Sequence, residues 1–145
     1  MDLSQEQLDF ITSGVAAAMI TVGGDGLAKP VRVGVGLLDG RLCSTATASR
    51  RRTVRLRSDP RCTLYFCDPA FKYLAVETTV TIDEGQAGVD GSERLIRAMQ
   101  GVPQGPVSWF GQTLEPEAFR QRLADEGRVL YRFEVASAHG LLRVP

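Results

Sequence analysis

The close spacing of its strand-forming runs is the feature that most restricts the fold of this chain. Three β-rich runs, Ala17–Val22, Ala28–Leu38 and Arg41–Thr45, are separated only by GGDG-containing and DG turns. Asp-Gly flanked by apolar residues is a strong short-range signal for a hairpin. Parallel neighbours would need crossovers of about a dozen residues or more, for which these gaps leave no room. The sequence therefore predicts antiparallel pairing and excludes a doubly wound parallel sheet.

Further strands are predicted downstream, in RCTLYFCD and KYLAVETTVTIDEG, which are joined around DPAF. The last run, RVLYRFEVASAHGLLRV, is predicted to form a strand, a break at Gly140 and a few more extended residues. Val31, Val33 and Val35 alternate with small or charged residues, which is typical of a strand with one buried face. About six strands in hairpins predict a mainly β fold, an antiparallel β-barrel with peripheral helices.

Four segments read as helices around this barrel. LSQEQLDFITSGV opens with a capping-box pattern, Ser4 followed by Gln7. DGSERLIRAMQG is predicted as a short helix with Ser92 as its cap, and EPEAFRQRLADEG as a helix with Pro116 in its first turn and Gly127 at its end. The fourth is the basic segment SRRRTVRLRSDP.

Composition limits the class of partner. The 145 residues suit a single domain, which we expect to span residues 1–145. Lys plus Arg equals Asp plus Glu, so the zero formal net charge argues against binding to nucleic acid or to an acidic membrane through bulk electrostatics. The N-terminus, MDLSQEQLDFI, lacks the features of a signal peptide. We therefore expect a cytoplasmic protein with a small-molecule substrate.

The residue types that usually carry catalysis or bind metals are sparse. The chain has three cysteines, Cys43, Cys62 and Cys67, an odd number without a CxxC motif. We therefore interpret them as reduced, buried thiols. His139 is the only histidine and is interpreted as structural. No nucleophile elbow, GxGxxG after a strand or spaced carboxylate pair is present. The sequence predicts no metal site and no catalytic side chain, which leaves the chemistry to a cofactor.

The basic segment is the strongest candidate for a binding site. We expect a short helix with Ser49 at its N-cap, Pro60 just beyond its end, and Val54 and Leu56 anchoring it to the barrel. Backbone donors at a helix start, adjacent hydroxyls and arginine side chains together make a compact anion site. The alternative is a solvated, arginine-rich helix face without a ligand.

Several motifs in order resemble the pyridoxamine-phosphate-oxidase superfamily of flavin-binding split β-barrels. The stretch GRLCSTATASRRRTVRLRSDPRCTLYF is similar to that of the branch that uses the deazaflavin coenzyme F420. TVGGDGLAKPVRVGV, KYLAVETTVTI and GRVLYRFEVASAHGL extend the resemblance over nearly the whole chain. Arg52 stands where this branch usually has lysine, and Thr78 where it usually has glycine.

The resemblance implies a six- to seven-stranded split β-barrel and a homodimer with two cofactor clefts at the subunit interface. By the same resemblance, Arg50 and Arg52 hold the cofactor phosphate, assisted by Ser49 and Thr53. The remaining predicted cofactor-binding residues are Thr45 and Thr47, along the ring and ribityl chain, and Phe71, which reaches the partner subunit's cleft.

Three functions remain open at this stage. The first is F420-dependent reduction of a conjugated or unsaturated small molecule. The second is an oxidase or reductase that binds FMN, and the third is a non-catalytic carrier of the cofactor or of a tetrapyrrole. Coenzyme F420 has a longer anionic tail than FMN, and Arg51, Arg55, Arg57 and Arg61 are candidates to bind it. These additional arginines favour the first function.

Overall fold

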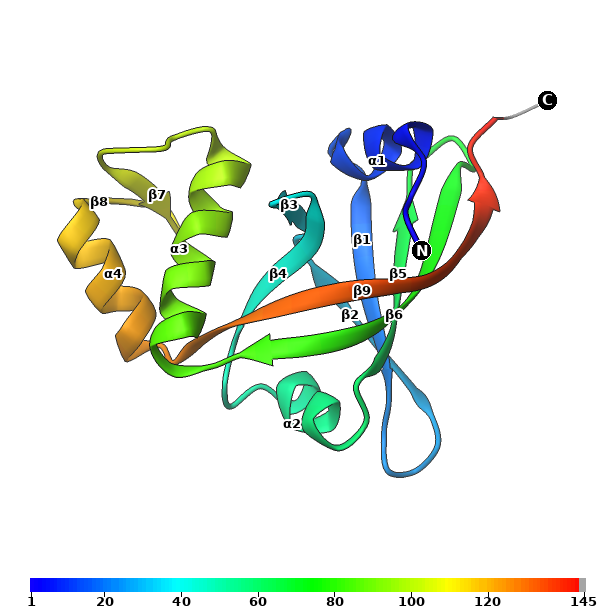
Figure 1. Ribbon diagram of the computed structural model, residues 1–145, viewed down its shortest axis with the longest axis horizontal. Coiled ribbons are helices and arrows are strands. Elements are labelled where there is room, and N and C mark those ends of the chain that lie inside the picture. Colours follow the sequence, from blue (N-terminus) through cyan, green and yellow to red (C-terminus); the bar gives the residue numbers. More distant parts are fainter. Residues whose placement is uncertain (144–145) are drawn as a thin grey trace.

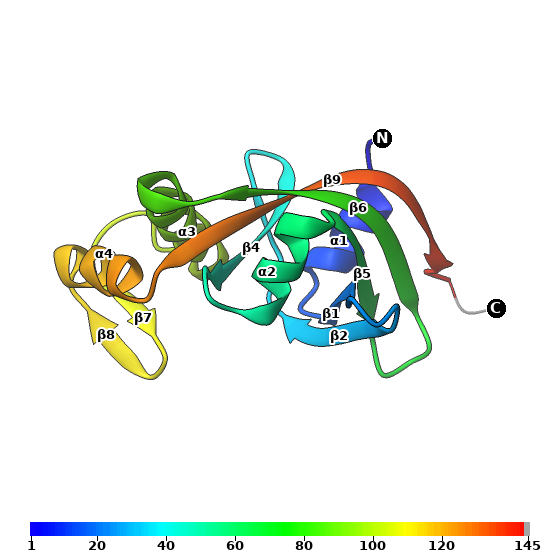
Figure 2. The ribbon, with the colours of Figure 1, turned by 90° about the horizontal axis from the view of Figure 1, so that it is seen from below.

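A computed structural model describes residues 1–143. One seven-stranded antiparallel sheet, in the order β2-β1-β5-β6-β9-β4-β3, forms most of it. Its strands are β1 (Ala16–Val22), β2 (Ala28–Val33), β3 (Gly36–Leu38), β4 (Arg41–Thr47), β5 (Arg61–Cys67), β6 (Tyr73–Asp83) and β9 (Arg128–Leu141). The long strands β6 and β9 lie side by side at its centre (Figures 1 and 2).

Helices and a small hairpin cover the ends of the sheet. They are α1 (Gln5–Thr12), α2 (Arg51–Ser58), α3 (Gly85–Gln100), α4 (Pro116–Asp125) and the hairpin β7 (Val107–Trp109) with β8 (Gln112–Leu114). In Figure 1, α3, α4 and the hairpin gather at one end, and α1 lies at the other. Figure 2 shows α2 across the strands, between these two ends.

The two largest of three apolar clusters give the fold most of its core. The larger lies inside the barrel, where Met19, Leu64, Phe66, Val76 and Tyr131 are almost fully buried. The smaller packs α3, α4 and the β7–β8 hairpin around buried apolar side chains: Val89, Ile96, Val107, Trp109, Phe119 and Leu123. The predicted alternation along and just beyond β2 is confirmed: Val31, Val33 and Val35 all pack against the barrel core. Each of these side chains is half-buried rather than fully buried.

Local signals located most of the elements. The capping box of α1 is confirmed in both directions, Gln7 N–H to Ser4 Oγ at 3.1 Å and Ser4 N–H to Gln7 Oε1 at 2.8 Å. Pro116 occupies the first turn of α4 as predicted, and Gly127 adopts the left-handed conformation just beyond that helix. Within residues 1–143, no helix has both the length and the apolar character needed to cross a bilayer.

Two predicted strands have different limits in the structure. The run Ala28–Leu38 divides into β2 and β3, which occupy opposite edges of the sheet, so the chain crosses the open side of the barrel between them. The predicted break at Gly140 is wrong, because β9 continues through it, paired with Leu74. Glycine is needed there because a Cβ would lie 2.1 Å from the carbonyl oxygen of Tyr73.

Helix α3 is longer than predicted, because it begins before the predicted segment, which starts at Asp90. It begins at Gly85, so Ser92 lies inside the helix, fully buried, and is not its cap. The early turns were missed because glycine weakens helices intrinsically. Packing explains these residues: a Cβ on Gly88 would lie 2.6 Å from the carbonyl oxygen of Arg128, and one on Gly91 2.7 Å from Leu130. The β7–β8 hairpin was not predicted at all.

Thr78, where the resembling proteins usually have glycine, lies at an irregularity of the sheet. The pairing of β6 with β9 shifts register between Glu77 and Thr78. The Thr78 side chain is buried and its hydroxyl donates to the carbonyl oxygen of Cys62 at 2.8 Å. The structure therefore accommodates the larger side chain with its polar group satisfied.

We predict that Gly140→Ala destabilises the fold by about 1–3 kcal/mol, because the new methyl group displaces the backbone of β6. Urea unfolding of the wild type and the variant measures this. Gly24→Ala is the matched control, because a Cβ at that turn position meets nothing within 4 Å. Equal stability of the two variants would show that β9 can move away from Tyr73 at no cost.

Candidate functional site

The basic segment forms α2, but the helix begins later than predicted. Its N-cap is Arg50, which is extended and whose N–H donates to the Thr47 carbonyl oxygen at 3.2 Å. Ser49 precedes the cap and is exposed. No side chain caps the helix, and its first turn contains no acidic residue. The first-turn N–H groups thus lack a side-chain acceptor, and the positive end of the helix dipole faces outward.

Helix α2 is anchored by Thr53 and Leu56, both of which are fully buried. The prediction that Val54 anchors the helix is wrong, since that side chain is exposed. The Thr53 hydroxyl donates to the Thr47 carbonyl oxygen at 2.8 Å and is hydrogen-bonded to the Tyr131 hydroxyl. Thr53, predicted to assist phosphate binding, is thus buried with its hydroxyl in use and does not line the groove described below.

Tyr131 lies beneath α2, at the inner end of this contact. Burial raises the pKa of its hydroxyl, while the hydrogen bond with Thr53 and the nearby Arg52 guanidinium oppose the shift. The phenol therefore stays protonated at neutral pH. Since Thr53 gives its proton to the Thr47 carbonyl, Tyr131 is the donor to Thr53. This chain of bonds fixes the end of β4 against the start of α2.

An open groove of about 870 Å³ lies beside the start of α2. Five arginines and one carboxylate line it, together with smaller residues: Val31, Thr47, Ser49, Arg50, Arg51, Arg52, Arg55, Glu126 and Arg128. Four of the seven predicted cofactor-binding residues, namely Thr47, Ser49, Arg50 and Arg52, are thus brought together. In a chain with no formal net charge, this groove is a local concentration of positive charge.

The arginines on the α2 side of the groove have no acidic partner. Among residues 1–143, no ion pair involves Arg50, Arg51, Arg52 or Arg55. Arg55 is held by a neutral group, with Nε donating to Thr21 Oγ1 at 2.8 Å. Arg52 Nε is buried and has no hydrogen-bond partner within the described residues. Because these four guanidinium groups line the groove without a carboxylate to balance them, this side of the groove is suited to an anion.

Two further arginines, one in α2 and one at the start of β5, lie outside the groove. Arg57 pairs with Glu84 at 2.6 Å, and Arg61 pairs with Asp59 at 2.8 Å. The hydrogen bond from Arg61 lowers the pKa of Asp59 to about 2. Since both guanidinium groups are already paired and neither lines the groove, the structure does not support their predicted use for a cofactor tail.

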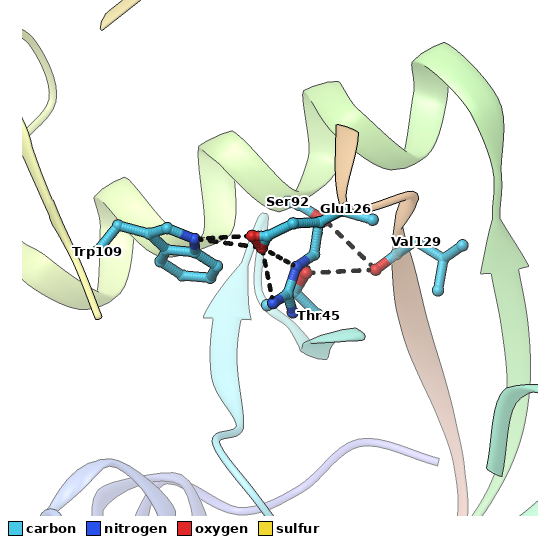
Figure 3. A network of polar contacts seen from close by, with 6 residues as sticks. Thr45, Ser92, Trp109, Glu126 and Val129 are labelled. Atoms are coloured by element: carbon cyan, nitrogen blue, oxygen red, sulfur yellow. Dashed lines mark hydrogen bonds and ion pairs between the residues drawn. The ribbon is translucent and has the colours of Figure 1, made fainter. Parts of the chain in front are cut away.

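Thr45 and Phe71 are not part of the groove within one chain. The Thr45 hydroxyl is bonded to the Ser92 hydroxyl at 2.8 Å under α3 (Figure 3), so a direct contact with a cofactor ring is not supported. Phe71 is 84% exposed in the turn between β5 and β6, with a positive φ of 70°. That turn and α2 lie at opposite ends of β5 (Figure 1).

A polar network that the sequence did not reveal forms the other side of the groove (Figure 3). Glu126 Oε1 accepts from Arg128 Nη2 at 3.0 Å, and Glu126 Oε2 accepts from Trp109 Nε1 at 3.1 Å. The Arg128 guanidinium lies 4.9 Å from the centre of the Trp109 ring, within cation–π range. Because these contacts join β9 to the unpredicted hairpin, no local pattern identified them.

The cysteines and the histidine lie outside the groove. Cys43 and Cys62 are buried free thiols, and burial raises the pKa of each to about 11. They are therefore protonated and unreactive at neutral pH, while Cys67 is partly exposed. His139 is exposed on β9. No cluster of metal-binding side chains occurs among residues 1–143.

Several solved structures have the same fold as this chain. An F420 reductase is 18% identical, with a TM-score of 0.65, over 90% of this chain and 94% of its own. A protein from Listeria innocua assigned as a pyridoxamine 5'-phosphate oxidase is 15% identical, with a TM-score of 0.65, over 97% of this chain and 100% of its own. A heme-binding protein from Mycobacterium smegmatis is 14% identical, with a TM-score of 0.66, over 97% of this chain and 55% of its own.

No protein-family model and no curated protein matches this sequence. Each of the three solved structures nevertheless matches the fold of this chain at a TM-score of 0.65 or 0.66. At these low identities they establish the fold alone. The prediction of a six- to seven-stranded antiparallel split β-barrel is confirmed, with seven strands in the sheet.

We predict that Thr53→Val lowers the free energy of unfolding by about 1–3 kcal/mol, because it removes the hydrogen bond to the buried Tyr131 hydroxyl and one of the two hydrogen bonds to the Thr47 carbonyl oxygen. Thr53→Ser keeps the hydroxyl and is expected to lose less. Thr113→Val, on the exposed side of β8, is the control and should stay within about 0.5 kcal/mol of the wild type. Urea unfolding that gives Thr53→Val the stability of the control would contradict the anchoring role.

Proposed function

Because the chain has the split β-barrel fold of the pyridoxamine-phosphate-oxidase-like proteins, we propose that the arginine-lined groove binds a flavin or deazaflavin cofactor through its phosphate. We further propose coenzyme F420 as that cofactor and reduction of a conjugated or unsaturated small molecule as the activity. FMN is the alternative cofactor. An F420 reductase and a protein assigned as a pyridoxamine 5'-phosphate oxidase among the structural neighbours support both candidates.

The single observation that carries the proposal is the group of unpaired arginines at the uncapped start of α2. Arg50, Arg51 and Arg52 line the groove and have no acidic partner in the described chain, and no side chain caps the first turn of the helix. A phosphate oxygen would satisfy both, because it accepts from a guanidinium and from backbone N–H groups at the same time. The donor set present therefore fits a phosphate monoester or diester.

Each groove residue has a part in this proposal. Arg50 and Arg52 bind the phosphate, and Ser49 contributes an exposed hydroxyl next to them. Thr47, at the end of β4, faces the remainder of the cofactor. Thr53 and Tyr131 act indirectly, by holding α2 against β4. The bound cofactor supplies hydride transfer, while these residues supply affinity and position.

The charge beyond the phosphate site favours F420 over FMN. Arg51 and Arg55 also line a second, adjoining hollow of about 440 Å³, together with Lys29 and the β1–β2 turn. Lys29 is already paired with Asp25 at 2.8 Å, which leaves Arg51 and Arg55 as the uncompensated cations. A longer anionic tail can use this second hollow, whereas FMN ends at its phosphate.

We also propose a homodimer in which a second chain completes each cofactor cleft. The face carrying Val31, Val33 and Val35 is apolar and only half-buried, and Phe71 exposes an aromatic ring in a conformation that is unfavourable for its residue type. We expect an obligate interface that buries more than about 2,000 Å². Sedimentation at micromolar concentration should show only dimers, and a stable monomer would contradict this part of the proposal.

We predict that the purified protein binds F420 more tightly than FMN, and that raising the salt concentration weakens F420 binding more, because exposed charges are screened. Titrations followed by the distinct absorbance of each cofactor measure both effects. Equal affinities without salt dependence would favour FMN. Hemin is included because one structural neighbour is a heme-binding protein. Binding of hemin with no binding of either flavin would replace the proposal by a tetrapyrrole carrier.

We predict that Arg52→Ala weakens cofactor binding by roughly 10- to 100-fold, since a charge-assisted hydrogen bond contributes about 1.5–3 kcal/mol. Arg52→Lys should lose less, because it keeps the charge but not the planar fork. Arg61→Ala is the matched control, because Arg61 follows the basic segment directly but is exposed and lies outside the groove. Melting of each apo variant separates lost binding from lost folding. Equal affinities of Arg52→Ala and Arg61→Ala would show that the segment is a solvated face.

A further inference from the structure

The corner Glu126-Gly127-Arg128 holds the wall of the groove that faces α2. Gly127 takes a φ of 65°, which turns the chain from the end of α4 into β9. Its carbonyl oxygen accepts from Ala48 N–H at 2.8 Å, and Arg128 pairs with Thr47 across the β4–β9 ladder. The corner is therefore fixed to the segment that leads into the basic helix, so the two walls keep their relative position.

The charge of Arg128 is neutralised inside this corner. Glu126 Oε1 accepts from Arg128 Nε at 3.2 Å and from Nη2 at 3.0 Å. The two side chains are only 12% and 24% exposed, so solvent screens the pair less than a surface pair. Trp109 stacks on the guanidinium and donates its Nε1–H to the same carboxylate. Arg128 thus differs from the other groove arginines, which lack an acidic partner.

The groove is consequently polarised. Its α2 side carries four arginines without an acidic partner in the described chain, and its β9 side carries a neutral, hydrogen-bonded pair. We propose that Glu126 is a specificity-determining residue: by neutralising Arg128 it confines the uncompensated positive charge to the α2 side. The anionic group of the ligand then binds beside α2, and a neutral polar part of the same ligand lies against Arg128 and Glu126. This inference rests on the proposed function and refines it.

Replacing the carboxylate by an amide tests this directly, with inorganic pyrophosphate as the anionic probe and calorimetry as the measurement. Glu126→Gln keeps the size and a hydrogen-bond acceptor but leaves Arg128 uncompensated. We expect its affinity for pyrophosphate to rise about two- to fivefold at low salt, as a nearby added charge should give. Glu117→Gln, an exposed site on α4 outside the groove, makes the same change in net charge and should bind as the wild type does.

A second pair of variants keeps the proposal testable if Glu126→Gln does not fold, and it excludes a purely structural role. Arg128→Gln leaves Glu126 uncompensated and should weaken pyrophosphate binding about two- to fivefold. The double variant Glu126→Gln with Arg128→Gln removes both charges and should restore the wild-type affinity. A direct contact between Arg128 and the anion, or a structural role of the pair, would instead leave the double variant as weak as Arg128→Gln.

The outcomes separate this inference from the proposed function. Pyrophosphate affinity unchanged or lowered in a folded Glu126→Gln variant, or no recovery in the double variant, overturns the role of Glu126 and leaves cofactor binding untouched. A wild type that binds pyrophosphate but neither F420 nor FMN overturns the proposed function, while the comparison among variants still decides the charge balance. A wild type that binds none of these anions overturns both.

Discussion

The antiparallel pairing of β6 with β9 is the interaction on which the rest of the structure depends. It joins the β2-β1-β5 part of the sheet to the β4-β3 part, and it runs from Tyr73 opposite Leu141 to Asp83 opposite Leu130. Strand β9 also begins at Arg128 and carries Tyr131 three residues later, under the basic helix. The same strand therefore closes the barrel, supports α2 and supplies one wall of the groove.

The parts of the fold that were predictable from sequence are those with local causes. Short Asp-Gly turns allowed only antiparallel neighbours, the capping box marked the start of α1, and Pro116 and Gly127 marked the ends of α4. The failures have long-range causes. Gly88 and Gly91 weaken a helix locally, yet they are required where α3 approaches β9, and Gly140 was mistaken for a break because its constraint is the Tyr73 carbonyl on another strand.

The same distinction applies to the candidate site. Thr47, Ser49, Arg50 and Arg52 are neighbours in sequence, so one motif could identify them together. Sequence could not show that Thr53 turns inward to Tyr131, because that contact spans 78 positions. Nor could it show the β9 wall, since Trp109, Glu126 and Arg128 meet only through packing of the hairpin, α4 and the final strand.

The position of Trp109 has a practical consequence. It is the only tryptophan in the chain, and its indole touches both members of the ion pair that lines the groove. Indole emission responds to charges and to the polarity of its immediate surroundings. The protein therefore carries an intrinsic fluorophore at the edge of its candidate site, with no second tryptophan to obscure the signal. Changes around the Glu126–Arg128 ion pair can therefore be followed by tryptophan fluorescence in the unlabelled wild-type protein.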